Sequence, residues 1–138
     1  MLGSLLADRI ELASFPVSTQ SHRVPVVDGH TASLSVRLDS DVGADAVART
    51  LASHRGLSHL QLPIAPPAPI VVTDAEDRPQ PRLDAAAGES MVATVGRIRR
   101  CPVLTVKMLV VGHNLVRGAA AAALLNAEAL HAMNLLPA

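Results

Sequence analysis

The sequence predicts an α+β domain in which a mostly antiparallel or mixed sheet of about five strands carries helices on one face. The first observation is that residues 30–38 alternate between apolar and polar side chains, as a half-buried strand does, and that 91–97 and 103–111 are two further strand candidates. The second is that residues 44–54 place apolar side chains at helical spacing, and that 117–133 are rich in alanine and leucine.

The remaining elements follow from local signals. Residues 9–12 predict a short strand, and residues 15–20 predict extended chain. Asp45 suits the positive end of the helix over 44–54, and Gly56 ends that helix. Asn114 is the expected N-cap of the last helix, because its side chain can satisfy an amide of the first turn.

Six of the ten prolines lie between Pro63 and Pro81. This density excludes a helix and a central strand, because proline lacks a backbone donor and restricts the residue before it. We therefore expect a long loop in which Ile70-Val71-Val72 forms a short edge strand.

The composition excludes several classes of function. The formal net charge is zero and the pI is about 7.0, so the chain has no electrostatic footprint for nucleic acid or for an anionic membrane. Phe15 is the only aromatic residue, which leaves no platform on which bases could stack. The longest apolar run, 119–125, is far shorter than the ~20 residues that span a bilayer. We expect a cytoplasmic chain of one domain, with no nucleic-acid or membrane partner.

Cysteine and histidine usage predicts no metal site. Cys101 is the only cysteine, which excludes an internal disulfide and fits a reducing cytoplasm. The six histidines show no His-x-x-x-His spacing. Arg99 and Arg100 stand beside Cys101 and would lower the pKa of its thiol, as in a nucleophile, so the residues alone leave open whether Cys101 is reactive or an inert turn residue.

The segment from Arg23 to His30 contains the candidate site. On a continuous strand these two side chains would point to opposite faces, roughly 23 Å apart. Pro25 and the pair Asp28-Gly29 are turn signals, so we expect the chain to bend and to bring His30 back toward Arg23. A small anion could then touch a guanidinium fork and an imidazole that titrates near neutrality. The alternative is a solvated arginine and a histidine with only a turn role.

Four segments carry a resemblance to a known family. RVPVVDGHT at 23–31, EDRPQPRLD at 76–84, VGRIR at 95–99, and GHN with RGAA at 112–120 resemble, in this order, the aspartate-semialdehyde dehydrogenases of archaea, fungi and some bacteria. The resemblance covers nearly the whole chain, but only about the last two-fifths of a full-length member. Where the family usually continues the second segment with an Arg-Asp pair, this chain has Ala85-Ala86, so any ion pair made there is lost.

The resemblance implies a domain organisation. Residues 1–138 would be a partial C-terminal catalytic and dimerisation domain without a Rossmann domain, and residues 112–138 would form a terminal helix that packs on the missing cofactor domain. The sequence contains no glycine-rich dinucleotide loop. The family's nucleophilic cysteine lies much earlier in the chain, on a turn that opens a helix, so Cys101 is expected to be inert.

The resemblance also implies roles for three residues. The arginine matching Arg23 grips the substrate carboxylate, the histidine matching His30 is the acid/base beside the catalytic cysteine, and the asparagine matching Asn114 faces the nicotinamide. The complete enzyme converts aspartyl phosphate to aspartate semialdehyde with NADPH, in the biosynthesis of lysine, threonine and methionine. We expect this chain to be inactive alone and not to bind NADP alone.

Two functions stay open at this point. The first is the C-terminal part of an NADP-dependent aspartate-semialdehyde dehydrogenase, which acts on an acyl phosphate and assembles with a missing N-terminal domain or with further copies of itself. The second is a non-catalytic oligomerisation module or gene remnant. Malonyl-coenzyme A reductases are related to this branch, so the acyl substrate also stays open.

Overall fold

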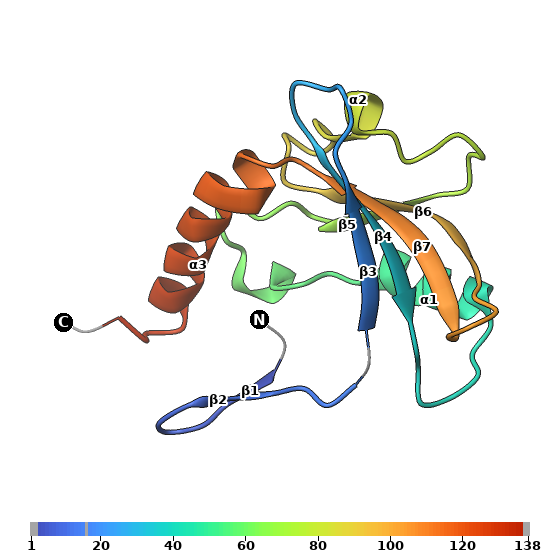
Figure 1. The fold of residues 1–138 in the computed structure, drawn as a ribbon. Helices are drawn as coiled ribbons and strands as arrows, with labels where there is room; N and C mark the ends of the chain where they lie inside the picture. Colours follow the sequence, from blue (N-terminus) through green and yellow to red (C-terminus); the bar gives the residue numbers. More distant parts are fainter. Residues whose placement is uncertain (1–2, 16, 137–138) are drawn as a thin grey trace.

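A five-stranded mixed sheet forms the body of the molecule (Figure 1). The structure is a computed structural model that describes residues 3–15 and 17–136. Neighbouring strands of this sheet pair antiparallel, except for the strands over Ile70–Thr73 and Ala93–Arg100, which pair parallel. In spatial order the strands are β3 (Val17–His22), β4 (His30–Val36), β7 (Val106–Gly112), β6 (Ala93–Arg100) and β5 (Ile70–Thr73). The predicted α+β class with a mixed sheet is confirmed.

The other elements surround this sheet. A separate hairpin projects from it in Figure 1, and the C-terminal helix stands beside it. The predicted strand over 9–12 is one arm of the hairpin, and Pro16, within the extended chain predicted over 15–20, lies outside the described residues. These elements are β1 (Gly3–Leu5), β2 (Ile10–Leu12), α1 (Ala44–Ser53), a 3-10 turn (Ser58–Leu60), α2 (Pro81–Asp84), a π-helical turn (Val116–Ala120) and α3 (Ala121–Ala132).

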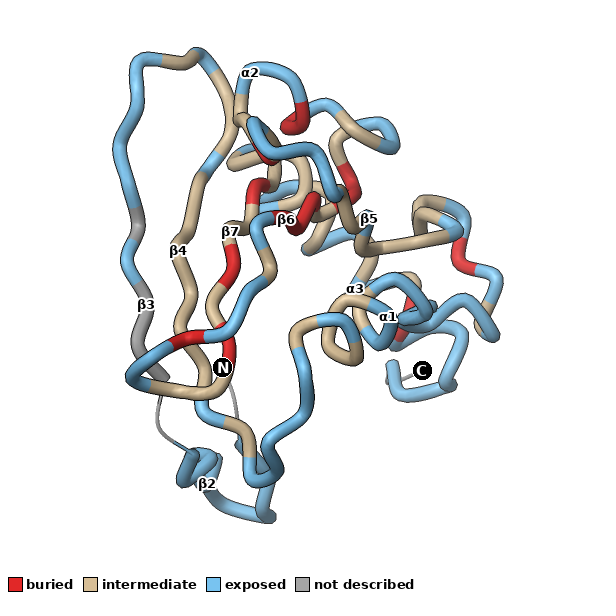
Figure 2. The backbone as a smooth tube through the Cα atoms, turned by 90° about the vertical axis from the view of Figure 1, so that its right-hand side faces the viewer, coloured by how far each residue is buried: buried red, intermediate tan, exposed pale blue. Residues whose placement is uncertain are grey.

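The core lies where β6 and β7 meet α1. Val95, Val106 and Met108 form its buried centre, and β4 and α1 pack apolar side chains against them. The alternation of β4 explains this, because Leu34 and Val36 lie on the face that points to the core. Figure 2 shows the buried residues following β6 and β7. The strand and the helix predicted over 30–38 and 44–54 are confirmed.

The proline-rich segment is a loop with one edge strand, as predicted. Ile70-Val71-Val72 lies in β5, which pairs parallel to β6 at the edge of the sheet. The loop ends at Pro81, the first residue of the short helix α2. Proline is compatible with this position, because the first helical residue needs no backbone donor.

The C-terminal helix begins differently from the prediction. Regular α-helix starts at Ala121, after one π-helical turn over Val116–Ala120, instead of at Arg117. Asn114 is not its N-cap, because its Oδ1 accepts the distant N–H of Gly29. The side chain of His113 bonds the start of the π-helical turn instead: its Nδ1 accepts the N–H groups of Leu115 and Val116 at 3.1 and 3.2 Å. Within residues 3–15 and 17–136, no helix has the length and apolar character needed to cross a bilayer.

Candidate functional site

The segment from Arg23 to His30 is the loop of the β3–β4 hairpin. His22 pairs with Thr31 at the end of the ladder, so Arg23 and His30 occupy the next opposite positions, where the loop begins and ends. The bend predicted from Pro25 and Asp28-Gly29 is therefore confirmed. Both side chains are exposed, which leaves them free to meet a ligand.

The three predicted site residues line one surface hollow of about 730 Å³. Arg23 and His30 come from the hairpin, and Asn114 comes from the segment after β7. Valines of the hairpin loop give the hollow an apolar wall. His22 also lines the hollow, since β3 ends at His22 and the hairpin loop begins at Arg23. The hollow thus offers a fixed cation, imidazoles and an amide to the same ligand.

Gly29 fixes the approach of the chain to His30. Its φ of +109° is a conformation that residues with a side chain rarely adopt. A Cβ at this position would lie 2.8 Å from Cβ of Pro81 and 3.0 Å from Cβ of Ala85, so α2 leaves no room for one. The N–H of Gly29 donates to Oδ1 of Asn114 at 2.8 Å. Glycine is therefore required by the backbone angle and by the close approach of α2.

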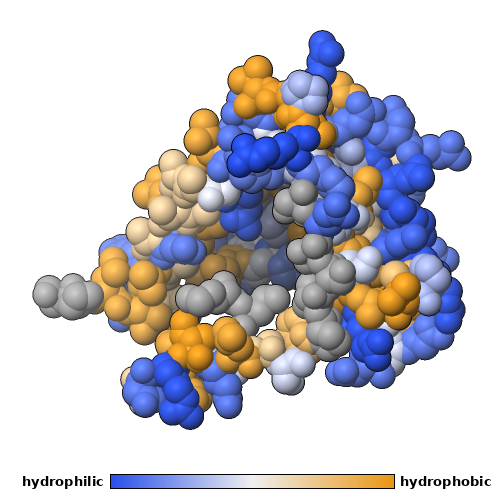
Figure 3. Space-filling view, in the orientation of Figure 1, coloured by the Kyte–Doolittle hydropathy of each residue, from blue (hydrophilic) through white to orange (hydrophobic). Residues whose placement is uncertain are grey.

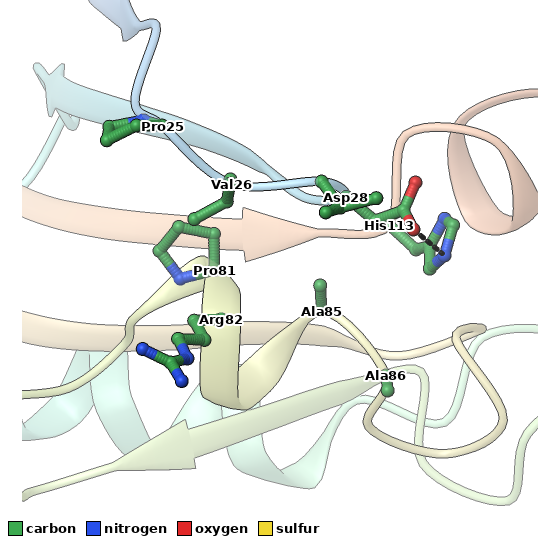
Figure 4. Close-up of a pocket in the computed structure, with 9 residues that line it drawn as sticks. Pro25, Val26, Asp28, Pro81, Arg82, Ala85, Ala86 and His113 are labelled. Carbon is green, nitrogen blue, oxygen red and sulfur yellow. Dashed lines mark ion pairs between the residues drawn. The ribbon is translucent and has the colours of Figure 1, made fainter.

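A second, smaller hollow of about 400 Å³ lies between the hairpin loop and α2 (Figure 4). Ala85 and Ala86 line it with short side chains, and Arg82 lies at one end. At the other end Asp28 and His113 face each other, with 4.0 Å between Oδ2 and Nε2. Sequence reasoning did not single out His113 or this contact. The position of His113 in the GHN segment was the available signal, since His113 directly precedes Asn114, a predicted site residue.

An ion pair between a half-buried arginine and a buried aspartate holds α2. The Arg78 guanidinium binds both carboxylate oxygens of Asp84, with 2.8 Å between Nε and Oδ2. Oδ2 of Asp84 also accepts the N–H of Gln80 at 2.6 Å. These bonds, those from Arg78 first, hold the pKa of the Asp84 carboxyl below its usual value although burial opposes them. The family's Arg-Asp pair is absent at Ala85-Ala86, but this pair within the EDRPQPRLD segment anchors the helix that supports Gly29.

Cys101 belongs to the opposite end of the sheet. It is buried, its N–H donates to the Thr105 carbonyl, and its Sγ accepts the N–H of Leu104 at 3.3 Å. Backbone N–H groups, that of Leu104 first, lower the pKa of the thiol. The whole of β7, roughly 20 Å long at the usual rise of a strand, separates this turn from the end of β7 that pairs with His30. Cys101 therefore cannot act as a nucleophile in the hollow that contains His30.

No group of three or more histidine, cysteine, aspartate or glutamate side chains suited to a metal ion occurs among the residues that the structure describes. The hollow itself presents the guanidinium of Arg23 and the imidazole of His30. Arginine binds a carboxylate through two parallel N–H groups, and histidine exchanges protons near neutral pH. Together they suit a small carboxylate substrate that reacts with proton transfer.

Comparisons with known proteins identify the family of this chain. The family model for the semialdehyde dehydrogenase dimerisation domain matches residues 2–117. The aspartate-semialdehyde dehydrogenase of Archaeoglobus fulgidus is 47% identical over 128 residues, which are 93% of this chain and 36% of that protein. The enzyme of Methanothermobacter thermautotrophicus is 45% identical over 134 residues, which are 95% of this chain and 39% of that protein.

A solved structure gives the same result for the fold. The crystal structure of the Candida albicans aspartate-semialdehyde dehydrogenase with NADP superposes with a TM-score of 0.75 at 42% identity, over 83% of this chain and 33% of that one. This chain therefore spans between 33% and 39% of the length of these relatives. The expected resemblance and its partial extent are both confirmed. The chain belongs to the semialdehyde dehydrogenase family and comprises its dimerisation domain.

Proposed function

We propose that this chain supplies the substrate-binding and acid/base part of an aspartate-semialdehyde dehydrogenase. The observation that carries the proposal is that Arg23, His30 and Asn114 line one hollow. Arg23 and His30 come from one loop, and Asn114 comes from a distant part of the sequence. The relatives that match at 47% and 45% identity are enzymes of that name. The substrate class is an acyl phosphate with a free carboxylate.

Each side chain has a distinct task in this proposal. Arg23 holds the substrate carboxylate with its planar fork and so orients the reacting carbonyl carbon. His30 takes the proton of the attacking thiol and gives a proton to the phosphate that leaves. The thiol comes from the part of the enzyme that this chain does not span, since Cys101 lies at the far end of the sheet.

NADP is the proposed cofactor of the complete enzyme, and it supplies the hydride that reduces the acyl group. The Candida albicans relative was solved with NADP. In this chain Asn114 fits one end of that cofactor: its Oδ1 is used by Gly29, and its Nδ2 remains a donor suited to the nicotinamide carboxamide. The pyrophosphate must be held elsewhere, since no glycine-rich loop occurs in this sequence.

The proposed partners are a second copy of the chain and the cofactor-binding part of the enzyme. The match to a dimerisation domain supports the first partner. The segment 112–138 supports the second, since α3 exposes leucines that an intact enzyme would cover. We place that helix against the cofactor-binding part.

The experiment is reconstitution. The chain is joined to the preceding part of the Archaeoglobus fulgidus enzyme, and steady-state kinetics are measured for R23K and H30A. R23K keeps the charge but loses the two parallel N–H donors of the guanidinium. KM should therefore rise by an amount that corresponds to about 1.5–3 kcal/mol of lost binding free energy, while kcat changes little. H30A removes the proton acceptor, so kcat should fall roughly 10²–10⁴-fold. R49K and H54A, which change exposed side chains on and after α1, are the matched controls and should behave as wild type.

A non-catalytic oligomerisation module is the second candidate function. The observation that favours it is the exposed apolar surface on the β1–β2 hairpin and on α3. If R23K and H30A both keep full activity, the assigned roles are wrong and this second function becomes the better account. A comparison of aspartyl phosphate with malonyl-coenzyme A as substrates decides which acyl group the reconstituted enzyme takes.

A further inference from the structure

We infer that His113 is a positioning residue that sets where the His30 imidazole lies, by connecting the Asp28-Gly29 turn to the π-helical turn over Val116–Ala120. The inference rests on the proposed function for its catalytic meaning. Its geometric part stands on the contacts of His113 alone.

The first contact determines the tautomer of His113. Nδ1 accepts the N–H groups of Leu115 and Val116 at 3.1 and 3.2 Å, so it carries no proton. The proton of the neutral ring therefore lies on Nε2. The side chain is only 13% exposed, so the ring is held by its surroundings and does not turn freely in solvent.

The second contact directs Nε2 to the turn. Figure 4 shows the ring facing the Asp28 carboxylate, with 4.0 Å between Nε2 and Oδ2. This distance is too long for a good hydrogen bond. Nε2 still lies near this carboxylate in a half-buried place, where the attraction between an N–H group and a carboxylate is stronger than in bulk water.

The turn is held at three points, and His113 is the one that acts on Asp28. Asn114 accepts the N–H of Gly29, and Pro81 and Ala85 lie against the Gly29 Cα. Gly29 has no side chain with which to fix its own peptide planes, so its neighbours must fix them. His30 follows at once and pairs with Gly112, the residue immediately before His113. The end of β7 and the residues that follow it therefore hold the backbone at both Gly29 and His30, from which the imidazole projects.

Small displacements of an acid/base group are costly, because reacting atoms must lie within a narrow range of distance and angle. A shift of about 1 Å can cost on the order of 10²-fold in rate. Loss of His113 should therefore lower kcat of the reconstituted enzyme roughly 10–100-fold. KM should change less than kcat, because Arg23 lies at the other end of the loop.

The primary test is nuclear magnetic resonance of the 138-residue chain, which needs no activity. In the wild type, the ring nitrogens of His113 should show the tautomer with the proton on Nε2. H113A should shift the Gly29 amide and the His30 ring resonances. The matched control H131A, which changes an exposed histidine of α3, should shift neither.

Two conservative variants separate positioning from general stability. In H113N the short amide oxygen can still accept the Leu115 and Val116 N–H groups but does not reach Asp28; in H113Q the longer amide nitrogen reaches Asp28. H113N should restore most of the melting temperature while the His30 resonances stay displaced, and H113Q should bring those resonances back toward wild type. D28N should displace the His30 resonances as H113N does. The double variant D28N/H113N should displace them little further than either single variant.

Wild-type Gly29 and His30 resonances in H113A would overturn the inference. So would full additivity of D28N and H113N, since uncoupled residues add. A different result would contradict the proposed function: unchanged kinetics of the reconstituted enzyme in both R23K and H30A. In that case displaced resonances in H113A still establish that His113 places His30.

Discussion

At the scale of single residues, Asn114 shows how one side chain can replace another in a local role. Asparagine is a preferred N-cap, yet its Oδ1 bonds the N–H of Gly29, and the neighbouring His113 takes the amides of the helical turn. This exchange connects the start of the last helix to the loop of the β3–β4 hairpin. Asn114 thereby has a structural bond through oxygen and a proposed cofactor contact through nitrogen.

The two functions of Asn114 can be separated by substitution. N114D keeps the oxygen that accepts from Gly29 but loses the amide donor, so the free energy of unfolding should stay within about 0.5 kcal/mol of wild type. N114A leaves the Gly29 N–H without its partner and should lower that free energy by about 1–2 kcal/mol. Chemical denaturation measures both.

In the reconstituted enzyme, N114D and N114A should both weaken the binding of NADP, because both lack the donor. Calorimetric titration measures this affinity. N126A changes an exposed asparagine of α3 and is the control for both measurements. Wild-type NADP affinity in N114D would contradict the cofactor contact but leave the bond to Gly29 intact.

At the scale of elements, α2 is a four-residue helix that holds its position through one carboxylate. Asp84 is buried and accepts from Arg78 and from the N–H of Gln80. A helix this short has little stability of its own. The Asp84 carboxylate therefore maintains the wall against which Gly29 packs.

The dependence of stability on pH follows from Asp84. Its folded pKa is lowered from the ordinary 3.8 by the bonds from Arg78, so its contribution is present above that value and is lost as pH falls through the folded pKa. D84N should lower the free energy of unfolding at pH 7 by about 1.5–3 kcal/mol. Its difference from wild type should shrink below a pH of about 4.

Urea denaturation at a series of pH values measures this difference. D39N, which changes an exposed aspartate after β4, is the matched control and should follow wild type at each pH. A constant difference between D84N and wild type down to acid pH would show that the ionised carboxylate is not what stabilises α2.

At the scale of the whole molecule, the elements outside the sheet expose large apolar side chains. In the β1–β2 hairpin Leu5 is 84% and Leu12 is 72% exposed. Ala129 is the buried residue of α3, which exposes Leu124 and Leu130. Figure 3 shows apolar surface over both elements on this side of the molecule. Large exposed apolar patches on soluble proteins mark places where other chains or domains bind.

The chain by itself should therefore self-associate. L124Q/L130Q replaces two exposed leucines of α3 and should shift the distribution toward smaller species, as measured by light scattering over a range of concentrations. V103Q changes an exposed valine in the turn between β6 and β7 and should leave the distribution unchanged. A wild-type chain that stays monomeric at all concentrations would contradict the prediction that the exposed leucines of α3 bind another chain or domain.

The sequence by itself determined the strands of the five-stranded sheet, including the edge strand among the prolines, and also the first helix and the family, but it did not predict β1. These signals are local: alternation with period two, helical spacing and proline density each depend on neighbouring residues. The sequence also indicated the bend that brings His30 back to Arg23, because Pro25 and Asp28-Gly29 favour the backbone angles of a turn.

The tertiary structure alone decided which partners the polar side chains took. Asn114 bonds a residue 85 positions earlier, His113 faces Asp28, and Asp84 binds Arg78. A side chain such as that of Asn114 has several acceptable partners, both local and distant, whose free energies differ by about 1 kcal/mol. Packing of α2 and the end of β7 around the hairpin loop selects among them, and this packing depends on residues that lie far apart in the sequence.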